Sequence, residues 1–288
     1  MDTTEETREA AVSVTGLWVA GLRALESERP DRVFADPYAR DLAGTEFHNA
    51  HRLTGADEGY ALSPVVLRTR FSDAVLTDAV GRGIRQVVML GAGMDTRAYR
   101  LPLPADLALW ELDRAEPLDY KRAVLERAGA RAACRTVTVH ADLADPWEEE
   151  LLGAGLDTGL PTVWLVEGVF LYLDAATAES VAAAITRHSA PGSVLVFDAY
   201  GEGAFDAPAF AGWNAAFAER GTLLGPPQDE PDRWIARHGW RAAAYSRQDV
   251  LAGRCPWAPA EPRRVAEAFL DRSWMVRAEL PAPDGSAR

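Results

Sequence analysis

Cysteine and histidine are both scarce in this chain of 288 residues. The two cysteines, Cys134 and Cys255, lie far apart and form no CxxC pair, so the sequence offers no disulfide framework and favours a reducing compartment. Only two of the five histidines, His48 and His51, lie close together, and neither an acidic nor a thiol cluster accompanies them. The sequence therefore predicts no metal site.

The chain has fewer basic than acidic residues, and it has no long apolar run. The chain has 30 Lys and Arg against 43 Asp and Glu, a formal net charge of −13. An acidic surface repels phosphate backbones, so nucleic acid is not an expected partner. No apolar run approaches the roughly 20 residues that span a bilayer, and the acidic start at 1–6 is unlike a secretory signal. We expect a cytoplasmic protein without a membrane partner; the oligomeric state stays open.

The first part of the chain has the periodicity of helices. Apolar residues recur every three to four positions over 14–25 and again over 65–80. Proline-containing turns separate these stretches. We expect residues 1–82 to form a helical cap over the core that follows.

Strands and helices then alternate, which is typical of a parallel α/β sheet with right-handed crossovers. The expected strands are 86–90, 108–112, 136–140, 162–167 and 193–198. The expected helices are 95–99, 117–128, 147–152 and 175–188. We interpret 83–200 as a Rossmann-like core, whose ligands bind beyond the carboxyl ends of the strands.

The rest of the chain is expected to complete this single structural domain. Residues 201–235 are rich in glycine, alanine and proline and contain several aromatics, which favours an inserted helical lid. Residues 236–288 are expected to close the sheet with antiparallel strands. The predicted fold is therefore α/β, mostly parallel, with a C-terminal antiparallel part.

A glycine turn after the first strand indicates a nucleotide-type cofactor. The apolar run ending at Leu90 leads directly into Gly91 and Gly93, which suits a tight turn close to a ligand. A nicotinamide dinucleotide site expects a third glycine where Thr96 stands, and the carboxylate of Asp95 would face the pyrophosphate. S-adenosylmethionine has no phosphate and carries a sulfonium cation, so an acidic turn suits it.

Acidic residues at later strand ends are consistent with the same cofactor. Asp113 lies 22 positions after Gly91, where its carboxylate can accept ribose hydroxyls, although nicotinamide enzymes use the same arrangement. Asp142 can accept the adenine amino group, with Leu143 against the ring, but Asp142 could instead be a helix N-cap. Glu167 would face the methionine end, or it could be a solvated loop carboxylate.

The chain resembles the leucine carboxyl methyltransferase-like family of class I S-adenosylmethionine-dependent methyltransferases over about residues 10–200. The motifs that carry the resemblance are, in order, Arg29-Pro-Asp31, Asp36-Pro-Tyr-Ala-Arg40, Arg68-Thr-Arg-Phe71 with Asp73, Leu90-Gly-Ala-Gly-Met-Asp-Thr-Arg-Ala-Tyr-Arg-Leu101, Glu111-Leu-Asp113, Asp142-Leu143 and Glu167-Gly-Val-Phe-Leu-Tyr-Leu173.

This resemblance implies roles for residues of the cofactor site. Arg68 would hold the cofactor carboxylate, Gly91 would make backbone contact, and Glu167 would lie near the α-ammonium. Asp113 would bind the ribose, and Asp142 with Leu143 the adenine. Arg68 could instead be a surface helix arginine, and Arg70 competes for its role.

The resemblance also implies the acceptor class, namely methyl transfer to a carboxylate oxygen of a small metabolite or peptide; the residues themselves indicate only the cofactor. A carboxylate is already ionised at neutral pH and needs no general base, whereas a hydroxyl, phenol or amine of a secondary metabolite would need a base or an orienting group. Tyr172, Tyr200 and Arg97 are the candidate catalytic residues. Tyr172 could instead be a buried aromatic, and Arg97 a structural ion pair. The sequence also leaves room for a nicotinamide oxidoreductase or a non-catalytic cofactor-binding subunit.

Overall fold

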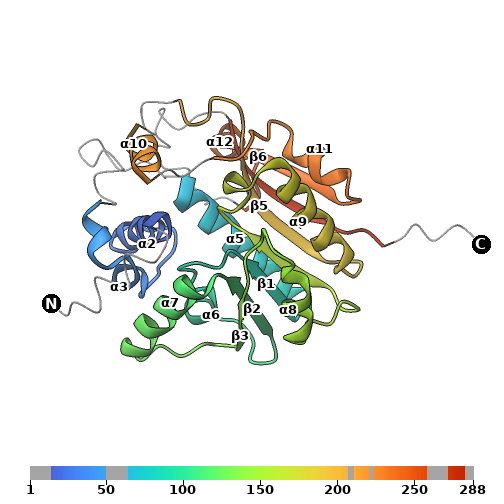
Figure 1. Cartoon of the computed structure of the whole chain (residues 1–288), viewed down its shortest axis with the longest axis horizontal. Helices are drawn as coiled ribbons and strands as arrows, with labels where there is room; N and C mark the ends of the chain where they lie inside the picture. Colours follow the sequence, from blue (N-terminus) through green and yellow to red (C-terminus); the bar gives the residue numbers. More distant parts are fainter. Residues whose placement is uncertain (1–13, 50–63, 207–210, 221–223, 258–271, 283–288) are drawn as a thin grey trace, which may run out of the picture.

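The computed structural model describes residues 14–49, 64–206, 211–220, 224–257 and 272–282. Its centre is a seven-stranded sheet in the order β3-β2-β1-β4-β5-β7-β6 (Figure 1). The strands are β1 (Gln86–Leu90), β2 (Ala108–Asp113), β3 (Arg135–His140), β4 (Thr162–Val166), β5 (Val194–Tyr200), β6 (Arg241–Ser246) and β7 (Ser273–Glu279). The first five pair in parallel, as the alternating pattern predicted.

Helices cover both faces of this sheet. The α-helices are α2 (Val14–Ser27), α3 (Ala39–Ala43), α5 (Pro64–Gly81), α6 (Arg97–Arg100), α7 (Ala115–Arg127), α8 (Trp147–Gly153), α9 (Ala175–Arg187), α10 (Ala211–Arg220), α11 (Pro231–Ala236) and α12 (Arg247–Leu251). Two short 3₁₀ helices are η1 (Gly44–Glu46) and η2 (Phe170–Tyr172). No helix in these described parts is long and apolar enough to span a membrane.

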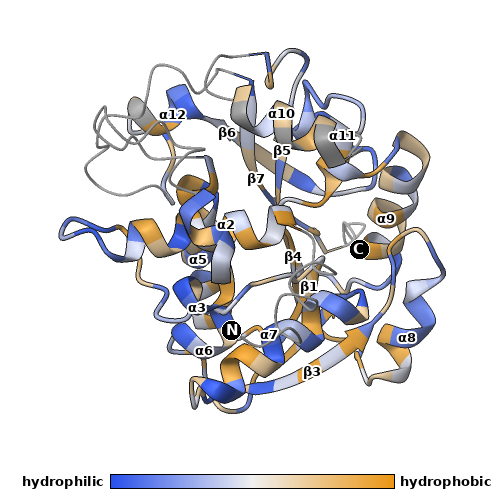
Figure 2. Cartoon of the chain, turned by 60° about the vertical axis from the view of Figure 1, so that its left-hand side comes forward, coloured by the Kyte–Doolittle hydropathy of each residue, from blue (hydrophilic) through white to orange (hydrophobic). Residues whose placement is uncertain are grey.

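The central strands are buried along their whole length because both of their faces are covered. After their first residues, Gln86 and Thr162, β1 and β4 are entirely hydrophobic (Figure 2). Successive side chains point to opposite faces, so Val87 and Met89 pack with α5, whereas Val88 and Leu90 pack with α8, α9 and α11. This double burial explains why short apolar runs predicted these strands well.

The carboxyl-terminal part completes the sheet with reversed polarity. β7 lies between β5 and β6 and is antiparallel to both, with Val194 opposite Glu279 and Arg241 opposite the same residue. The expected antiparallel closure is therefore confirmed. The two closing strands are not joined by a tight turn, since α12 follows β6 and residues 258–271 lie outside the described part.

The amino-terminal helices form a separate apolar cluster beside the sheet. α2 and α3 lie together at the left of Figure 1, with α10 above them. Leu17 and Leu42 are buried between them. α5 differs, because Phe71 and Val75 pack on the sheet itself. Of the predicted cap and lid, residues 1–13, 50–63, 207–210 and 221–223 lie outside the described part.

Candidate active site

A cavity of about 480 Å³ lies at the carboxyl ends of β1, β2, β4 and β5 and beneath α2 and α10. Its size suits a small-molecule ligand. The cavity wall contains every site residue that the sequence predicted, namely Arg68, Gly91, Gly93, Arg97, Asp113, Asp142, Leu143, Glu167, Tyr172 and Tyr200. Arg70 does not line it, so geometry favours Arg68 over its competitor.

The glycine turn after β1 has the backbone conformation that the sequence predicted. Gly91 and Gly93 have φ values of 64° and 42°, in the left-handed region that favours glycine. A Cβ at Gly91 would lie 2.6 Å from Val169 Cγ2, so a side chain there would collide with the loop after β4. The Gly93 amide donates to Asp113 Oδ2 across 2.7 Å, which ties the turn to the end of β2.

Asp113 is held by two backbone amides. Besides the bond from Gly93, its Oδ1 accepts from the Arg114 amide at 2.8 Å. Burial raises the pKa of this carboxyl group, and the two amide hydrogen bonds partly oppose that effect. The carboxylate is thus fixed in position on the cavity wall.

The end of β3 contributes Asp142 and Leu143 to the same wall. Asp142 is exposed, and its Oδ1 accepts from the Ala144 amide at 3.0 Å. The residue that caps α8 is Pro146, so Asp142 is not the N-cap of that helix. Leu143 is half-buried against the core.

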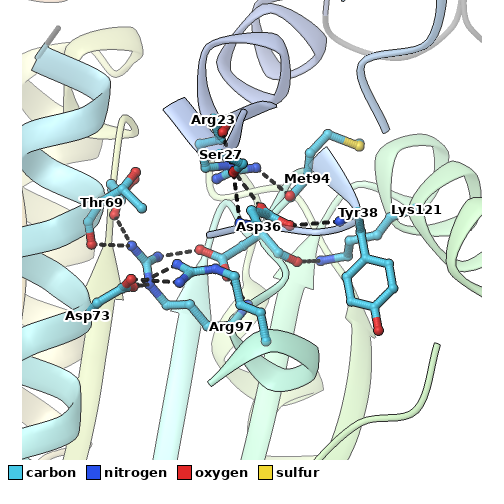
Figure 3. Close-up of polar contacts among 12 residues, drawn as sticks. Arg23, Ser27, Asp36, Tyr38, Thr69, Asp73, Met94, Arg97 and Lys121 are labelled. Carbon is cyan, nitrogen blue, oxygen red and sulfur yellow. Dashed lines mark hydrogen bonds and ion pairs between the residues drawn. The ribbon is translucent and has the colours of Figure 1, made fainter. Parts of the chain in front are cut away.

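Arg97 is at the centre of a buried ion-pair network (Figure 3). Its guanidinium donates to Asp73 Oδ1 at 2.6 Å, to Glu167 Oε2 at 2.7 Å and also to Asp95. Only 1% of Arg97 is exposed. The side chain therefore has the partners of a structural ion pair. Arg100 pairs with Asp73 through two further hydrogen bonds of 2.6 and 2.7 Å.

The arginines keep these buried carboxylates ionised. Burial alone would raise the pKa values of Asp73, Asp95 and Glu167, but the charge of Arg97 and its neighbours outweighs burial and lowers all three. The pKa of Asp95 falls to about 2. These carboxylates are consequently poor proton acceptors at neutral pH.

Arg68 extends the network toward β5. Its Nη1 lies 2.9 Å from Asp198 Oδ2, and its Nε lies 3.4 Å from Glu167 Oε1. This Nε is buried, and no described residue accepts a hydrogen bond from it. Three arginines, Arg68 among them, thus share a network with four carboxylates, which gives the buried group a net negative charge.

Sequence reasoning did not assign a role to Gly168. This residue has a φ of 68°, and a Cβ there would lie 2.8 Å from Arg68 Nη2. Its amide donates to Asp198 Oδ1 at 2.5 Å. The sequence did contain an indication of this role, because a glycine directly after an acidic residue at a strand end suggests that another group approaches the backbone closely.

Arg23 is a second residue that the sequence did not single out. It lies on α2, is 4% exposed and donates to the Met94 carbonyl in the glycine turn (Figure 3). Its Nε is 3.5 Å from Asp36 Oδ2. α2 is therefore tied to the turn by a buried cation. In the sequence, only the position of this arginine among the apolar residues of a helix indicated that its side chain is buried.

Two tyrosines and several aromatic rings form the remaining wall. Tyr172 is 37% exposed and hydrogen-bonded to the Thr15 side chain, and Tyr200 is hydrogen-bonded to Arg68. Burial raises the pKa values of both phenols, and Asp198 adds to the effect at Tyr200. Both hydroxyls therefore stay protonated at neutral pH.

Comparison with known proteins identifies the family of this chain. The family model for leucine carboxyl methyltransferase matches residues 16–186. A Streptomyces avermitilis protein is 35% identical over 264 residues, covering 87% of this chain and 90% of its own. A Frankia alni protein is 39% identical over 268 residues, covering 91% and 94%. Both are named as candidate S-adenosyl-L-methionine-dependent methyltransferases.

Solved structures show the same fold at low sequence identity. A candidate methyltransferase from Thermobifida fusca has a TM-score of 0.58 at 18% identity, covering 92% of this chain and 95% of its own. A DUF574 family protein from Streptomyces avermitilis has a TM-score of 0.57 at 18% identity, covering 91% and 97%. The chain belongs to the leucine carboxyl methyltransferase family and is an S-adenosylmethionine-dependent methyltransferase.

Proposed function

We propose that the protein methylates a carboxylate oxygen of a small-molecule acceptor. The supporting observation is the chemistry of the cavity wall. No histidine is among the described lining residues, Asp95 and Glu167 are paired with arginines, and Tyr172 and Tyr200 remain protonated. These groups cannot readily take a proton from an acceptor at neutral pH, and the other lining carboxylates, Asp113 and Asp142, are the ones proposed to hold the ribose and the adenine. An ionised carboxylate is the acceptor from which no proton has to be removed.

The residues present fit the cofactor that the family uses. The Arg68 guanidinium, whose Nε makes no hydrogen bond to the described residues, suits the carboxylate of the methionine end, and the net negative network around Glu167 suits its ammonium. Asp113 would hold the ribose hydroxyls, with Gly91 and Gly93 allowing close backbone approach.

Asp142 and Leu143 would bind the adenine at the end of β3. Asp142 is exposed toward the cavity and Leu143 is half-buried in its wall. When bound, the cofactor supplies a methyl group activated by the positive sulfur.

The chain itself contributes positioning and exclusion of water. Rate enhancement of this type comes from holding the acceptor oxygen in line within a closed, dry cavity. Arg68 donates to the Tyr200 hydroxyl, and in this proposal the hydrogen of that hydroxyl would orient an acceptor oxygen. We assign Tyr172 and Tyr200 to orientation of the acceptor and Arg97 to positioning of Glu167.

Transfer to a hydroxyl, phenol or amine is the second candidate. It would require a base that the paired carboxylates and protonated tyrosines do not readily provide. A nicotinamide oxidoreductase and a non-catalytic cofactor-binding subunit do not match the family assignment.

Labelled methyl transfer distinguishes the two acceptor classes. The protein is incubated with methyl-labelled S-adenosylmethionine and pairs of small acids and phenols that share one carbon skeleton. We expect the acid to take up label that mild alkali releases as methanol, the behaviour of a methyl ester. Label that enters only the phenol or an amine, and that survives alkali, would overturn the proposal.

A further inference from the structure

One end of the cavity is built from aromatic rings instead of charged groups. Phe205 follows β5, and Trp213 and Phe217 come from α10. Tyr172 on η2 and Tyr200 at the end of β5 complete this end. We call these five residues the aromatic end of the cavity.

The rings of the aromatic end are held by their neighbours. Trp213 meets Trp18 of α2 edge-on, with centroids 5.5 Å apart and planes at 84°. Trp18 is itself fixed, since its Nε1 donates to Glu46 across 2.6 Å. Trp213 also lies 5.9 Å from Phe217. A wall anchored in this way is ordered before a ligand arrives, which lowers the entropic cost of binding.

Two further ring contacts join α10 to η2 and the loop after β5 to the end of that strand. Phe217 meets Tyr172 at 6.3 Å and 89°, and Tyr200 lies 5.1 Å from Phe205. The tyrosines therefore belong to the aromatic packing and also present hydroxyls. Tyr172 and Tyr200 mark the boundary between the apolar wall and the charged network around Arg68.

The charges of the cavity lie elsewhere. In the part of α2 that adjoins this end, the lining residues are Thr15, Gly16 and Val19, and η2 adds Leu171. None of these side chains is charged. The described residues that line this end include no carboxylate, so a cationic amine would have no direct ion-pair partner among them, and a peptide backbone would find few polar partners among the rings.

We propose that the acceptor is an aromatic carboxylic acid whose ring system packs against Phe205, Trp213 and Phe217 and whose carboxylate faces the hydroxyls of Tyr172 and Tyr200. This inference rests on the proposed function and narrows it from small acids in general to flat aromatic ones. Ring faces and edges attract one another beyond the area they bury, and this favours a flat aromatic body over a saturated one.

The reaction balances without a base. A bond forms between the carboxylate oxygen and the methyl carbon, and the bond from that carbon to sulfur breaks. Its electron pair stays on sulfur, which becomes an uncharged thioether, and no proton moves. The product is a neutral methyl ester.

Equilibrium binding tests the ring preference separately from catalysis. The full chain is saturated with S-adenosylhomocysteine and titrated by calorimetry with 2-naphthoate, with its saturated decahydro analogue, and with 2-naphthol. We expect the naphthoate to bind about tenfold more tightly than the saturated acid. Turnover of the same compounds and of a short apolar peptide with a free carboxyl end is then measured with labelled cofactor.

Substitution of Trp213 tests the contribution of its ring, and two further variants serve as controls. Trp213→Leu should reduce the tenfold preference to about twofold or less, whereas Trp213→Phe should keep most of it. Trp257→Leu removes a tryptophan that does not line the cavity and should leave the preference unchanged. Affinity for S-adenosylhomocysteine reports whether each variant is folded at the cofactor site.

The outcomes separate this inference from the proposed function. Equal binding of aromatic and saturated acids, or faster esterification of the peptide, would overturn the aromatic assignment while leaving carboxylate methylation intact. Methylation of 2-naphthol but not of 2-naphthoate would overturn the proposed function. A retained ring preference in that case would still support the aromatic end as the acceptor site.

Discussion

Arg97 Nη2 donates to Glu167 Oε2 across 2.7 Å, which joins the helix after β1 to the residue after β4. The two residues are 70 positions apart. Their contact couples the loop beside the glycine turn to the carboxylate expected near the methionine end of the cofactor. Arg68 approaches the other oxygen of the same carboxylate. The network is therefore both a structural support and a source of negative charge in the site.

Glu167→Gln tests that charge. The amide keeps the size and one acceptor oxygen but removes the negative charge, so we expect affinity for S-adenosylmethionine to fall roughly 10- to 100-fold. Calorimetric titration measures the change. The control is Glu148→Gln on α8, which removes a half-buried partner of Arg187 and His188 that does not line the cavity. Unchanged cofactor affinity in Glu167→Gln would argue against an electrostatic role for this carboxylate.

Arg97→Met tests the structural role of the buried cation. It would leave Asp73, Asp95 and Glu167 without their shared partner in a buried site. We expect the free energy of unfolding to fall by about 3–5 kcal/mol, measured by urea denaturation. Arg187→Met breaks only a surface pair and should cost less than about 1 kcal/mol. Similar losses in the two variants would contradict the assignment.

Acid should destabilise the protein over a pH range that is set by the pKa values of Asp95 in the folded and unfolded states. Its folded-state pKa of about 2 lies below the ordinary value of 3.8 because Arg97 and Arg23 outweigh burial. A carboxyl group whose pKa is lower in the folded state contributes its full stabilisation at pH values above its unfolded-state pKa. This contribution is lost as the pH falls through the folded-state pKa. We expect Asp95 to contribute about 2 kcal/mol at neutral pH, lost between about pH 4 and pH 2.

Denaturation of Asp95→Asn across this range checks that expectation. The variant should be less stable than the parent at pH 6, and the difference should shrink toward pH 2. Asp145→Asn, at an exposed position before α8, is the matched control. A difference that stays constant with pH would contradict the argument.

Gly168→Ala tests the close approach of Arg68 to the backbone. A methyl group there would lie 2.8 Å from the guanidinium in addition to the strain of a φ of 68°. We expect Arg68 to be displaced and cofactor affinity to drop about tenfold, as for a lost charged hydrogen bond. Gly239 has a comparable φ of 88° but open space around it, so Gly239→Ala measures the effect of backbone strain without a steric clash. Equal cofactor affinity in both variants would remove Gly168 from the site.

Much of the fold could be predicted because its strongest signals are local. The fully buried strands 86–90 and 162–166 are short, and their apolar runs 87–90 and 163–166 are bounded by turn residues. The positive φ of Gly91 likewise follows from a glycine at the end of such a run. Strand-end acids were found because parallel strands present their carboxyl ends at one edge.

The parts that could not be predicted depend on distant partners. Arg23 meets Met94 across 71 positions, and Arg68 meets Asp198 across 130. No local pattern indicates that an arginine on a helix will be buried against a carboxylate of another strand. The aromatic end was likewise visible only as composition, since Trp18 and Trp213 meet through the fold.

The single-turnover rate as a function of pH tests the central claim most directly. The protein is preloaded with methyl-labelled S-adenosylmethionine and mixed with 2-naphthoate between pH 6 and pH 9. An acceptor that is already ionised needs no base, so we expect an alkali-labile ester to form at a rate that is flat across this range. A rate that rises tenfold with each pH unit, or label that survives alkali, would contradict carboxylate methylation.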